Sequence, residues 1–349
     1  MILFNEIVFI IIKKFQKLKM KKITLLGSGE ILLKLIPFIF EQTKYDQILV
    51  GYAPRHSKSI IQPGITFENK LLELSQKYKK LFTYCFDSLD DDKYDILCQS
   101  EIQISLGSAW IFKKNHIDKS PYLIHAHCTD LPKYRGGASS SWMLMSRYRN
   151  SAISIFRMNE GIDAGNLIYK RNFSFPESYT TPKEYDDLTT KELFISLKEF
   201  IKNFEDSKII EKGSPQDKSI ATYFPRLSSD IHSWINWDWD CEQVISFINA
   251  FGKPYEGAKT RLTSLNNSFV RIRDAKFYNK DGSFHPFKNG LIYRIFKSKI
   301  YVACHPYSIE INEISFQKKS HNLRLGDRFF SLSSDLDEAK SKRIYYLPK

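Results

Sequence analysis

The chain has 349 residues, of which 42% are hydrophobic and 14% aromatic. This composition excludes an intrinsically disordered protein and provides enough apolar side chains for two folded domains. The formal net charge of +13 predicts acidic partners, such as nucleic acid, an anionic membrane surface or a phosphorylated small molecule. Because the lysines are scattered along the chain, we expect them to lie on the surface in contact with solvent. The alternative is that they form a basic stripe that binds nucleic acid.

The five cysteines, Cys85, Cys98, Cys128, Cys241 and Cys304, include no Cys-x-x-Cys pair. Their odd number and wide spacing argue against a disulfide framework and against a zinc site. Free thiols are typical of a reducing compartment, so we expect a cytoplasmic protein. Cys128 lies within residues 123–166, which contain the residues best suited to catalysis. We expect its small side chain to fill space in the core, and the alternative is that it acts as a nucleophile.

Residues 1–19 contain an apolar run only from Val8 to Ile12, which is too short to span a bilayer. They have neither the leading positive charge nor the small-residue cleavage site of a signal peptide. Met20, followed by Lys-Lys-Ile-Thr-Leu-Leu-Gly-Ser-Gly, looks like a second start. We therefore expect residues 1–19 to be an extension of little functional weight and no stable membrane insertion. An amphipathic helix on a membrane surface is the alternative.

Strand and helix signals alternate along residues 20–204, which is the pattern of a doubly wound α/β domain. The apolar run 23–26 ends in Gly27-Ser28-Gly29 and leads into a helix over residues 31–36. This turn lacks the full Gly-x-Gly-x-x-Gly of dinucleotide-binding proteins, so such a cofactor is poorly supported. Further strands are expected at 47–51, 95–97, 102–106, 122–127, 152–157 and 167–169, and helices at 71–80, 139–147 (capped by its serines) and 189–204.

The last third of the chain has a different pattern. Residues 205–219 are polar and contain Gly and Pro, which is typical of a linker. A helix is expected over 241–251, followed by short aromatic strands at 269–273, 290–296, 300–304 and 309–314. We therefore predict an N-terminal extension (1–19), a Rossmann-like catalytic domain (20–204), a linker (205–219) and a small β-barrel-like C-terminal domain (220–349).

The residues best suited to catalysis lie between positions 123 and 166. His125 and His127 end a predicted strand and, separated by one residue, point to the same face. The carboxyl ends of strands in open α/β sheets are where ligands bind, and Asp163 follows in a loop that should reach the same edge. A neutral imidazole accepts protons near pH 7 and an adjacent carboxylate orients it, so we predict that His127 is a general base paired with Asp163. A strand-end histidine with a structural role and a metal site are the alternatives.

The run from His127 to Gly136 (His-Cys-Thr-Asp-Leu-Pro-Lys-Tyr-Arg-Gly) and the later Gly161-Ile-Asp-Ala-Gly165 resemble the folate-dependent formyltransferases. The signature of that family is Asn-x-His, then Leu-Pro-x-Tyr-Arg-Gly, then Gly-Ile-Asp-x-Gly. The resemblance spans residues 20–315 and includes segments 27–30, 221–227 and 251–258. It implies a Rossmann-like domain followed by an OB-like domain, and transfer of a formyl group from 10-formyltetrahydrofolate to a primary amine without a metal.

The resemblance also implies roles for individual residues. His127 and Asp163 match the catalytic His and Asp, whereas His125 stands where the family places an Asn that holds the formyl oxygen. A histidine N–H can donate the same hydrogen bond but can also titrate, so the alternative is a degenerate member with weakened or changed activity. The folate is expected to contact two loops through Ala109, Trp110, Phe112, Asn159 and Gly161.

Three features favour a nucleotide-linked amino sugar over tRNA as the source of the amine. Loop 52–61 carries Arg55 and Lys58 but no Gly-Arg-Gly-Lys stretch like that of the tRNA-binding relatives. The C-terminal segment is aromatic rather than densely basic. The stretch from Arg135-Gly136-Gly137 to Trp142 resembles branches linked to amino sugars of surface polysaccharides.

The remaining expectations concern partners. Arg135, Gly136 and Gly137 are predicted to face the amine substrate, and a structural turn is the alternative. Methionyl-tRNA formyltransferase is the second candidate activity, and an inactive module that binds folate or a nucleotide is the third. The aromatic C-terminal strands suggest a homodimer interface.

Overall fold

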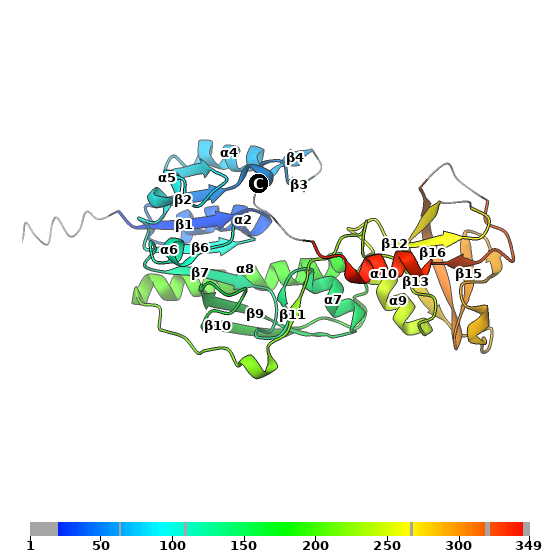
Figure 1. Ribbon diagram of the computed structural model, residues 1–349. Coiled ribbons are helices and arrows are strands. Elements are labelled where there is room, and N and C mark those ends of the chain that lie inside the picture. Colours follow the sequence, from blue (N-terminus) through cyan, green and yellow to red (C-terminus); the bar gives the residue numbers. More distant parts are fainter. Residues whose placement is uncertain (1–19, 63, 108–109, 266–267, 318–321, 345–349) are drawn as a thin grey trace, which may run out of the picture.

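A computed structural model describes residues 20–62, 64–107, 110–265, 268–317 and 322–344 as two lobes side by side (Figure 1). The predicted N-terminal extension and Ala109 lie outside the described residues. Within those ranges, no helix is both long enough and apolar enough to cross a membrane.

The larger lobe is built on a seven-stranded sheet with the order β10-β9-β7-β6-β1-β2-β5. The strands from β7 to β5 are parallel, and the antiparallel pair β9 and β10 extends the sheet beside β7. The strands are β1 (Lys22–Gly27), β2 (Gln47–Tyr52), β5 (Leu81–Cys85), β6 (Ile102–Leu106), β7 (Leu123–His127), β9 (Asn150–Arg157) and β10 (Leu167–Ser174).

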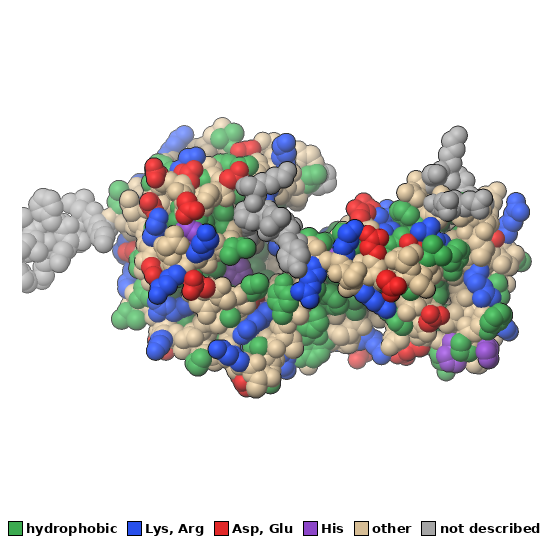
Figure 2. All heavy atoms as spheres, viewed as in Figure 1, with side chains coloured by type: hydrophobic (Ala, Val, Ile, Leu, Met, Phe, Trp, Pro, Cys, Tyr) green, Lys and Arg blue, Asp and Glu red, His purple; other side chains and the backbone are tan. Residues whose placement is uncertain are grey.

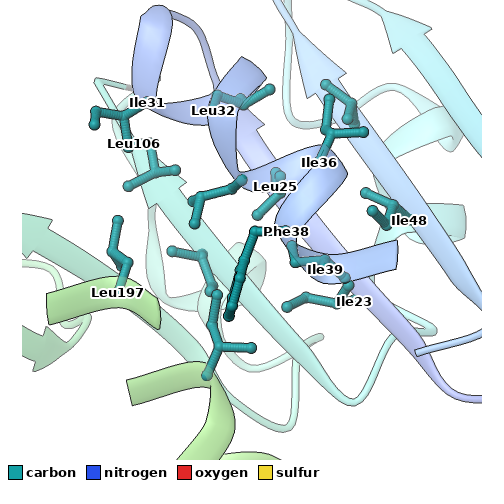
Figure 3. Packing of buried hydrophobic residues seen from close by; sticks show 14 of the residues in the cluster. Ile23, Leu25, Ile31, Leu32, Ile36, Phe38, Ile39, Ile48, Leu106 and Leu197 are labelled. Carbon is teal, nitrogen blue, oxygen red and sulfur yellow. The ribbon is translucent and has the colours of Figure 1, made fainter. Parts of the chain in front are cut away.

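Helices cover both faces of this sheet, as predicted for a doubly wound fold. The helices α2 (Glu30–Gln42), α4 (Phe67–Lys77) and α8 (Pro182–Ser207) bury their apolar sides against one face. On the other face lie α5 (Asp92–Leu97) and α6 (Lys114–Ile117). Because successive strand residues point to opposite faces, Leu25 of β1 joins the first core and Leu26 joins the second. Figure 3 shows Phe38 and Ile39 of α2 lying against Ile23 and Leu25.

The smaller lobe contains a six-stranded antiparallel sheet with the order β14-β15-β16-β13-β12-β17. Helix α9 (Cys241–Ala250) packs its buried face against the core of this sheet. A bridge between Leu291 and Arg328 joins the regions next to the two edge strands, so the sheet curls toward closure. The predicted β-barrel-like architecture is therefore confirmed. The strands are β12 (Ala258–Leu262), β13 (Phe269–Tyr278), β14 (Ile292–Phe296), β15 (Lys299–Cys304), β16 (Tyr307–Phe316) and β17 (Phe329–Phe330).

Several short helices and strands complete the fold, and some of them join the two lobes. Helix α7 lies against α9, and Ser141 of α7 donates a hydrogen bond to the carbonyl oxygen of Ala250. Strand β8 pairs in parallel with β11, which lies beyond the predicted linker. The short elements are α3 (Pro54–Ser57), β3 (Ile60–Gln62), β4 (Ile65–Thr66), β8 (Arg135–Gly136), α7 (Ser139–Met145), η1 (Lys218–Ile220), β11 (Tyr223–Phe224), η2 (Pro286–Lys288) and α10 (Ser333–Ser341).

One prediction of secondary structure near residue 90 is wrong, and one strand was missed. Residues 95–97 end helix α5 rather than forming a strand, because the Asp91 side chain accepts a hydrogen bond from the Lys93 amide and caps the helix. Strand β5 was not predicted. It lies at the sheet edge with Leu81 buried and Phe82 exposed, so its apolar pattern is weak.

The serines do not cap helix α7, contrary to the prediction. The residue that precedes the helix is Ala138, which adopts the left-handed conformation. Ser140 and Ser141 lie inside the helix, and their hydroxyl groups donate to Asp186 and to the Ala250 carbonyl. The residues that accept these bonds are distant in sequence, so the local pattern could not reveal this arrangement.

Candidate active site

His125 and His127 lie at the carboxyl end of β7, between β6 and β9. Their ring centroids are 6.2 Å apart, and both side chains are half-buried, whereas the intervening Ala126 packs into the first core. The period-two alternation of the strand therefore brings both imidazoles to the same face, as the sequence predicts.

The His127 ring lies between a backbone carbonyl and a carboxylate. Its Nε2 is 3.1 Å from the carbonyl oxygen of Tyr134. Since a carbonyl oxygen can only accept, Nε2 carries the proton of the neutral ring and Nδ1 is the basic nitrogen. Nδ1 lies 3.7 Å from Oδ2 of Asp163, which is too far for a direct hydrogen bond. The arrangement leaves the Nδ1 lone pair able to take a proton beside a carboxylate that would stabilise the resulting charge.

The turn after β7 supplies the carbonyl that orients His127. Tyr134 adopts the left-handed conformation with φ 55°. Its amide donates to the hydroxyl of Thr222 at 2.9 Å, and its carbonyl also accepts from the Thr129 hydroxyl at 3.2 Å. The Tyr134 carbonyl therefore sets the tautomer of His127. Thr222, which follows the predicted linker in sequence, holds Tyr134 in place.

His125 is neutral at pH 7. Burial lowers the pKa of His125 to about 4, and the nearby Asp163 carboxylate offsets this effect only in part. Its Nδ1 lies 3.0 Å from the hydroxyl oxygen of Ser105, which is its partner across the β6–β7 pairing. When that hydroxyl donates to Nδ1, the proton resides on Nε2 and can be donated to a ligand.

Asp163 lies in a tight loop that brings its carboxylate to His127. Its backbone is left-handed with φ 48°, and its Oδ2 accepts a hydrogen bond from the Gly136 amide at 2.8 Å. The loop begins with an Asn turn, in which the Gly161 amide donates to Oδ1 of Asn159 at 3.0 Å. It closes at Gly165, where a Cβ atom would lie 1.7 Å from the carbonyl oxygen of Arg157. Only glycine fits this closing position.

Gln216, from the predicted linker, contacts the same loop and was not identified by the sequence analysis. Its Oε1 accepts from Nε and Nη2 of Arg135 at 3.2 and 2.6 Å. Its Nε2 donates to the carbonyl oxygens of Asp163 and Gly165, each at 2.8 Å. The residue is only 8% exposed. A single glutamine in a polar stretch carries no local signal, so only the folded chain reveals these contacts.

The stretch Arg135-Gly136-Gly137, predicted to face the substrate, is engaged within the protein. Arg135 and Gly136 form β8, and Arg135 binds Gln216 while the Gly136 amide binds Asp163. The Gly137 amide donates to the carbonyl oxygen of Phe224 at 3.0 Å. These contacts favour the structural alternative, since both glycine amides already have acceptors.

The side chains of Trp110 and Phe112, two of the residues expected to contact the folate, are buried within the protein. The Trp110 ring stacks on Phe86 at 4.7 Å between centroids, and its indole N–H donates to the Asp87 carbonyl. Phe112 is buried in the second core. Ile111, between them, is 71% exposed. Among residues 110–112 of this loop, Ile111 therefore has the side chain that a ligand can reach.

Cys128 does not have the properties of a nucleophile. Its side chain packs against the first core, and burial raises the pKa of its thiol to about 12. The thiol is therefore protonated at pH 7, and the thiolate is the reactive form of cysteine. These properties favour the space-filling alternative.

The three site residues also form a set of donors that could hold a metal ion. One ring nitrogen from each of His125 and His127 and a carboxylate oxygen of Asp163 lie within 4.8 Å of one another. Two imidazoles and a carboxylate suit transition metals. The same three residues serve the acid–base arrangement described above.

The doubly wound sheet, the curled second sheet and the imidazole–carboxylate pair at the end of β7 are those of an α/β enzyme that performs acid–base chemistry. The family model for the formyl transferase C-terminal domain matches residues 229–323. A methionyl-tRNA formyltransferase from Kosmotoga olearia is 30% identical over 237 residues, which cover 67% of this chain and 70% of the relative. The chain belongs to the folate-dependent formyltransferase family.

Solved structures share the fold of both lobes. The N-formyltransferase from Helicobacter canadensis, in complex with folinic acid and dTDP-3-aminofucose, has a TM-score of 0.64 at 20% identity, covering 84% of this chain and 99% of that one. WlaRD, a sugar 3N-formyltransferase in the presence of dTDP and 5-N-formyl-THF, has a TM-score of 0.64 at 21% identity, covering 86% and 99%. At this level of identity the likeness establishes the fold alone.

Proposed function

We propose that the protein transfers a formyl group from 10-formyltetrahydrofolate to the primary amine of a nucleotide-linked amino sugar. The observation that carries this proposal is the position of His127 Nδ1, 3.7 Å from the Asp163 carboxylate and beside the neutral His125. The folate ligands of the two similar sugar N-formyltransferases support the choice of formyl donor.

In this proposal each of the three residues has one task. His127 Nδ1 takes the proton that the amine loses as its nitrogen bonds to the formyl carbon, and returns it to N10 of the folate as the bond between N10 and that carbon breaks. Asp163 stabilises the transient imidazolium. His125 donates its N–H to the formyl oxygen, which gains negative charge during the attack. 10-Formyltetrahydrofolate supplies the formyl carbon and the leaving nitrogen.

The folate contacts are proposed for two loops beside the histidines. Trp110 and Phe112 would act through their main-chain groups, because their side chains are buried. Asn159 and Gly161 would close the other side of the folate. Their turn precedes Asp163 directly, so folate binding and the position of the carboxylate would be linked through one short loop.

The distribution of charge on the face seen in Figure 2 supports a nucleotide-linked amino sugar over tRNA. Figure 2 shows Lys and Arg side chains interspersed with Asp and Glu over the visible face of the larger lobe, without a basic stripe. Many basic side chains have acidic partners, for example Arg171 with Glu192 and Arg261 with Asp335. Specific binding of tRNA depends strongly on unpaired positive charge near phosphates.

Methionyl-tRNA formyltransferase remains the second candidate, because the K. olearia relative carries that name. An inactive module that binds folate is the third. A homodimer and a cytoplasmic location stay predictions, as do the domain boundaries at residues 205–219.

One experiment separates these candidates. The purified chain is incubated with 10-formyltetrahydrofolate and, in parallel, with a panel of nucleotide-linked amino sugars or with charged initiator tRNA, and mass spectrometry detects formylation. We expect formylation of a sugar nucleotide that is insensitive to moderate salt and to chelator. Formylation of tRNA alone, with a steep salt dependence, would replace the sugar by tRNA. Folate binding without transfer to any amine would favour the inactive module, and activity abolished by chelator would favour a metal site.

A further inference from the structure

We infer that Gln216 is a positioning residue for formyl transfer, which holds the Asp163 carboxylate at His127 by fixing the main chain of the Asp163 loop. The inference rests on the proposed catalytic role of Asp163. Among the described residues, the hydrogen bonds of Gln216 go to Arg135 and to the Asp163 loop and to neither histidine, so it would act only through the loop.

Gln216 holds the Asp163 loop through two hydrogen bonds to its main chain. Both N–H groups of its amide are used, one on the carbonyl of Asp163 and one on the carbonyl of Gly165, each at 2.8 Å. These carbonyls bracket a segment whose first residue has a positive φ of 48°. For a residue other than glycine, this conformation is unfavourable by roughly 1–2 kcal/mol. It persists only where surrounding contacts determine it, and Gln216 supplies two such contacts.

The hydrogen bonds around Gln216 form a closed circuit. The Gly136 amide binds the Asp163 carboxylate at 2.8 Å, and the adjacent Arg135 binds Oε1 of Gln216 at 2.6 Å. Gln216 then returns to the Asp163 carbonyl. The carboxylate is thus fixed along two routes, directly by Gly136 and indirectly through its own main chain.

Only an amide side chain offers an acceptor to Arg135 and two donors to the two carbonyls while staying neutral. A glutamate in the same place would keep the acceptor for Arg135 but would point an oxygen at two carbonyl oxygens. An asparagine would be one methylene too short to span the same groups. Burial makes such a mismatch expensive, because water cannot replace the missing partners.

Gln216→Glu tests the donor half of this circuit, and Gln99→Glu is the matched control, an exposed glutamine with the same change of charge. Two quantities are measured for each variant. The first is kcat per folate-binding site, with KM for both substrates, so that inactive molecules are not counted. The second is the amide proton resonance of Gly136 in protein labelled with ¹⁵N-glycine, assigned by its change in Asp163→Asn.

We expect Gln216→Glu to lower kcat about 10- to 100-fold with KM within about twofold, since small displacements of catalytic groups have effects of this size. The Gly136 resonance should move upfield as its bond to Asp163 weakens, and Gln99→Glu should change neither quantity. If Gln216→Glu does not fold, Gln216→Met removes the same hydrogen bonds without introducing repulsion, and the same results are expected.

Three results would overturn the inference: unchanged kcat, a rise of KM alone, or a fall in kcat with an unmoved Gly136 resonance. The NMR measurement does not require activity. If the unsubstituted protein transfers formyl to no amine, the proposed function fails. The Gly136 resonance still decides whether Gln216 places Asp163.

Discussion

His125 and His127 are held by a strand, whereas Asp163 is held by a loop whose contacts come from distant parts of the chain. The ladder bonds of β7 to β6 and β9 set the direction of both imidazoles. Asp163 depends instead on the Gly136 amide and on Gln216. The two halves of one site therefore have different structural origins.

This difference predicts how each half should fail. Replacing a histidine removes a chemical group from a rigid strand, so activity should change more than folding does. Disturbing the loop should change both, because its left-handed backbone depends on the contacts around it. The following substitutions test this distinction, in order of decreasing expected effect.

His127→Ala should lower the rate of formyl transfer by about 10³- to 10⁴-fold, since the general base is lost. Folate affinity should stay within about twofold, because the strand and the two loops remain in place. Steady-state kinetics and equilibrium folate binding measure the two quantities. If His127→Ala also lost folate binding, the end of β7 would be needed to keep the two folate-binding loops in place.

Asp163→Asn should lower kcat by about 10²- to 10³-fold, because the partner of the imidazolium loses its charge. The asparagine oxygen can still accept from the Gly136 amide, so thermal stability should fall by no more than a few degrees. Kinetics and a thermal melt provide the comparison. Retention of full activity would remove Asp163 from the mechanism.

Gly165→Ala should destabilise the protein by about 3 kcal/mol, because its Cβ atom would lie 1.7 Å from the Arg157 carbonyl oxygen. Gly282→Ala is the control: φ is +81° there, but the added Cβ meets no atom within 4 Å. The control should be destabilised by only about 1 kcal/mol, from backbone conformation alone. Chemical denaturation measures both, and equal effects would argue against close approach at Gly165.

The stability of the protein should fall between pH 6.5 and pH 4 relative to that of His125→Asn. Burial lowers the pKa of His125 from 6.5 to about 4 in the folded state. Between these values the unfolded chain binds the extra proton, so folding becomes less favourable as the pH decreases. The difference should reach up to about 3 kcal/mol near pH 4. Denaturation curves at several pH values measure this difference, and the same pH dependence in both proteins would contradict a His125 that stays neutral in the folded state.

Cys128→Ala should retain formyl transfer within about threefold, with a loss of stability of about 1 kcal/mol from the small cavity. Burial raises the pKa of the Cys128 thiol to about 12, so alkylating reagents should not modify it at pH 7. Activity and peptide mass mapping after alkylation measure these outcomes. Complete loss of activity with normal folding would restore the nucleophile alternative.

The sequence was sufficient for the parallel sheet, the histidine pair and the class of the fold, because these depend on patterns between neighbouring residues. Apolar runs that end in Gly-Ser-Gly or His-x-His mark the carboxyl ends of strands, and residues two apart must share a face. The same reasoning missed strand β5, since Leu81 is buried but Phe82 is exposed at the sheet edge.

The tertiary structure alone decided how the carboxylate meets the imidazole. Gln216 lies in a polar stretch that is typical of a linker, yet it is buried against the Asp163 loop. Trp110 was expected to contact the folate, and only the structure shows that its ring is buried in the second core, stacked on Phe86. Such contacts join residues far apart in sequence, and no local period or composition encodes which distant partner a side chain will meet.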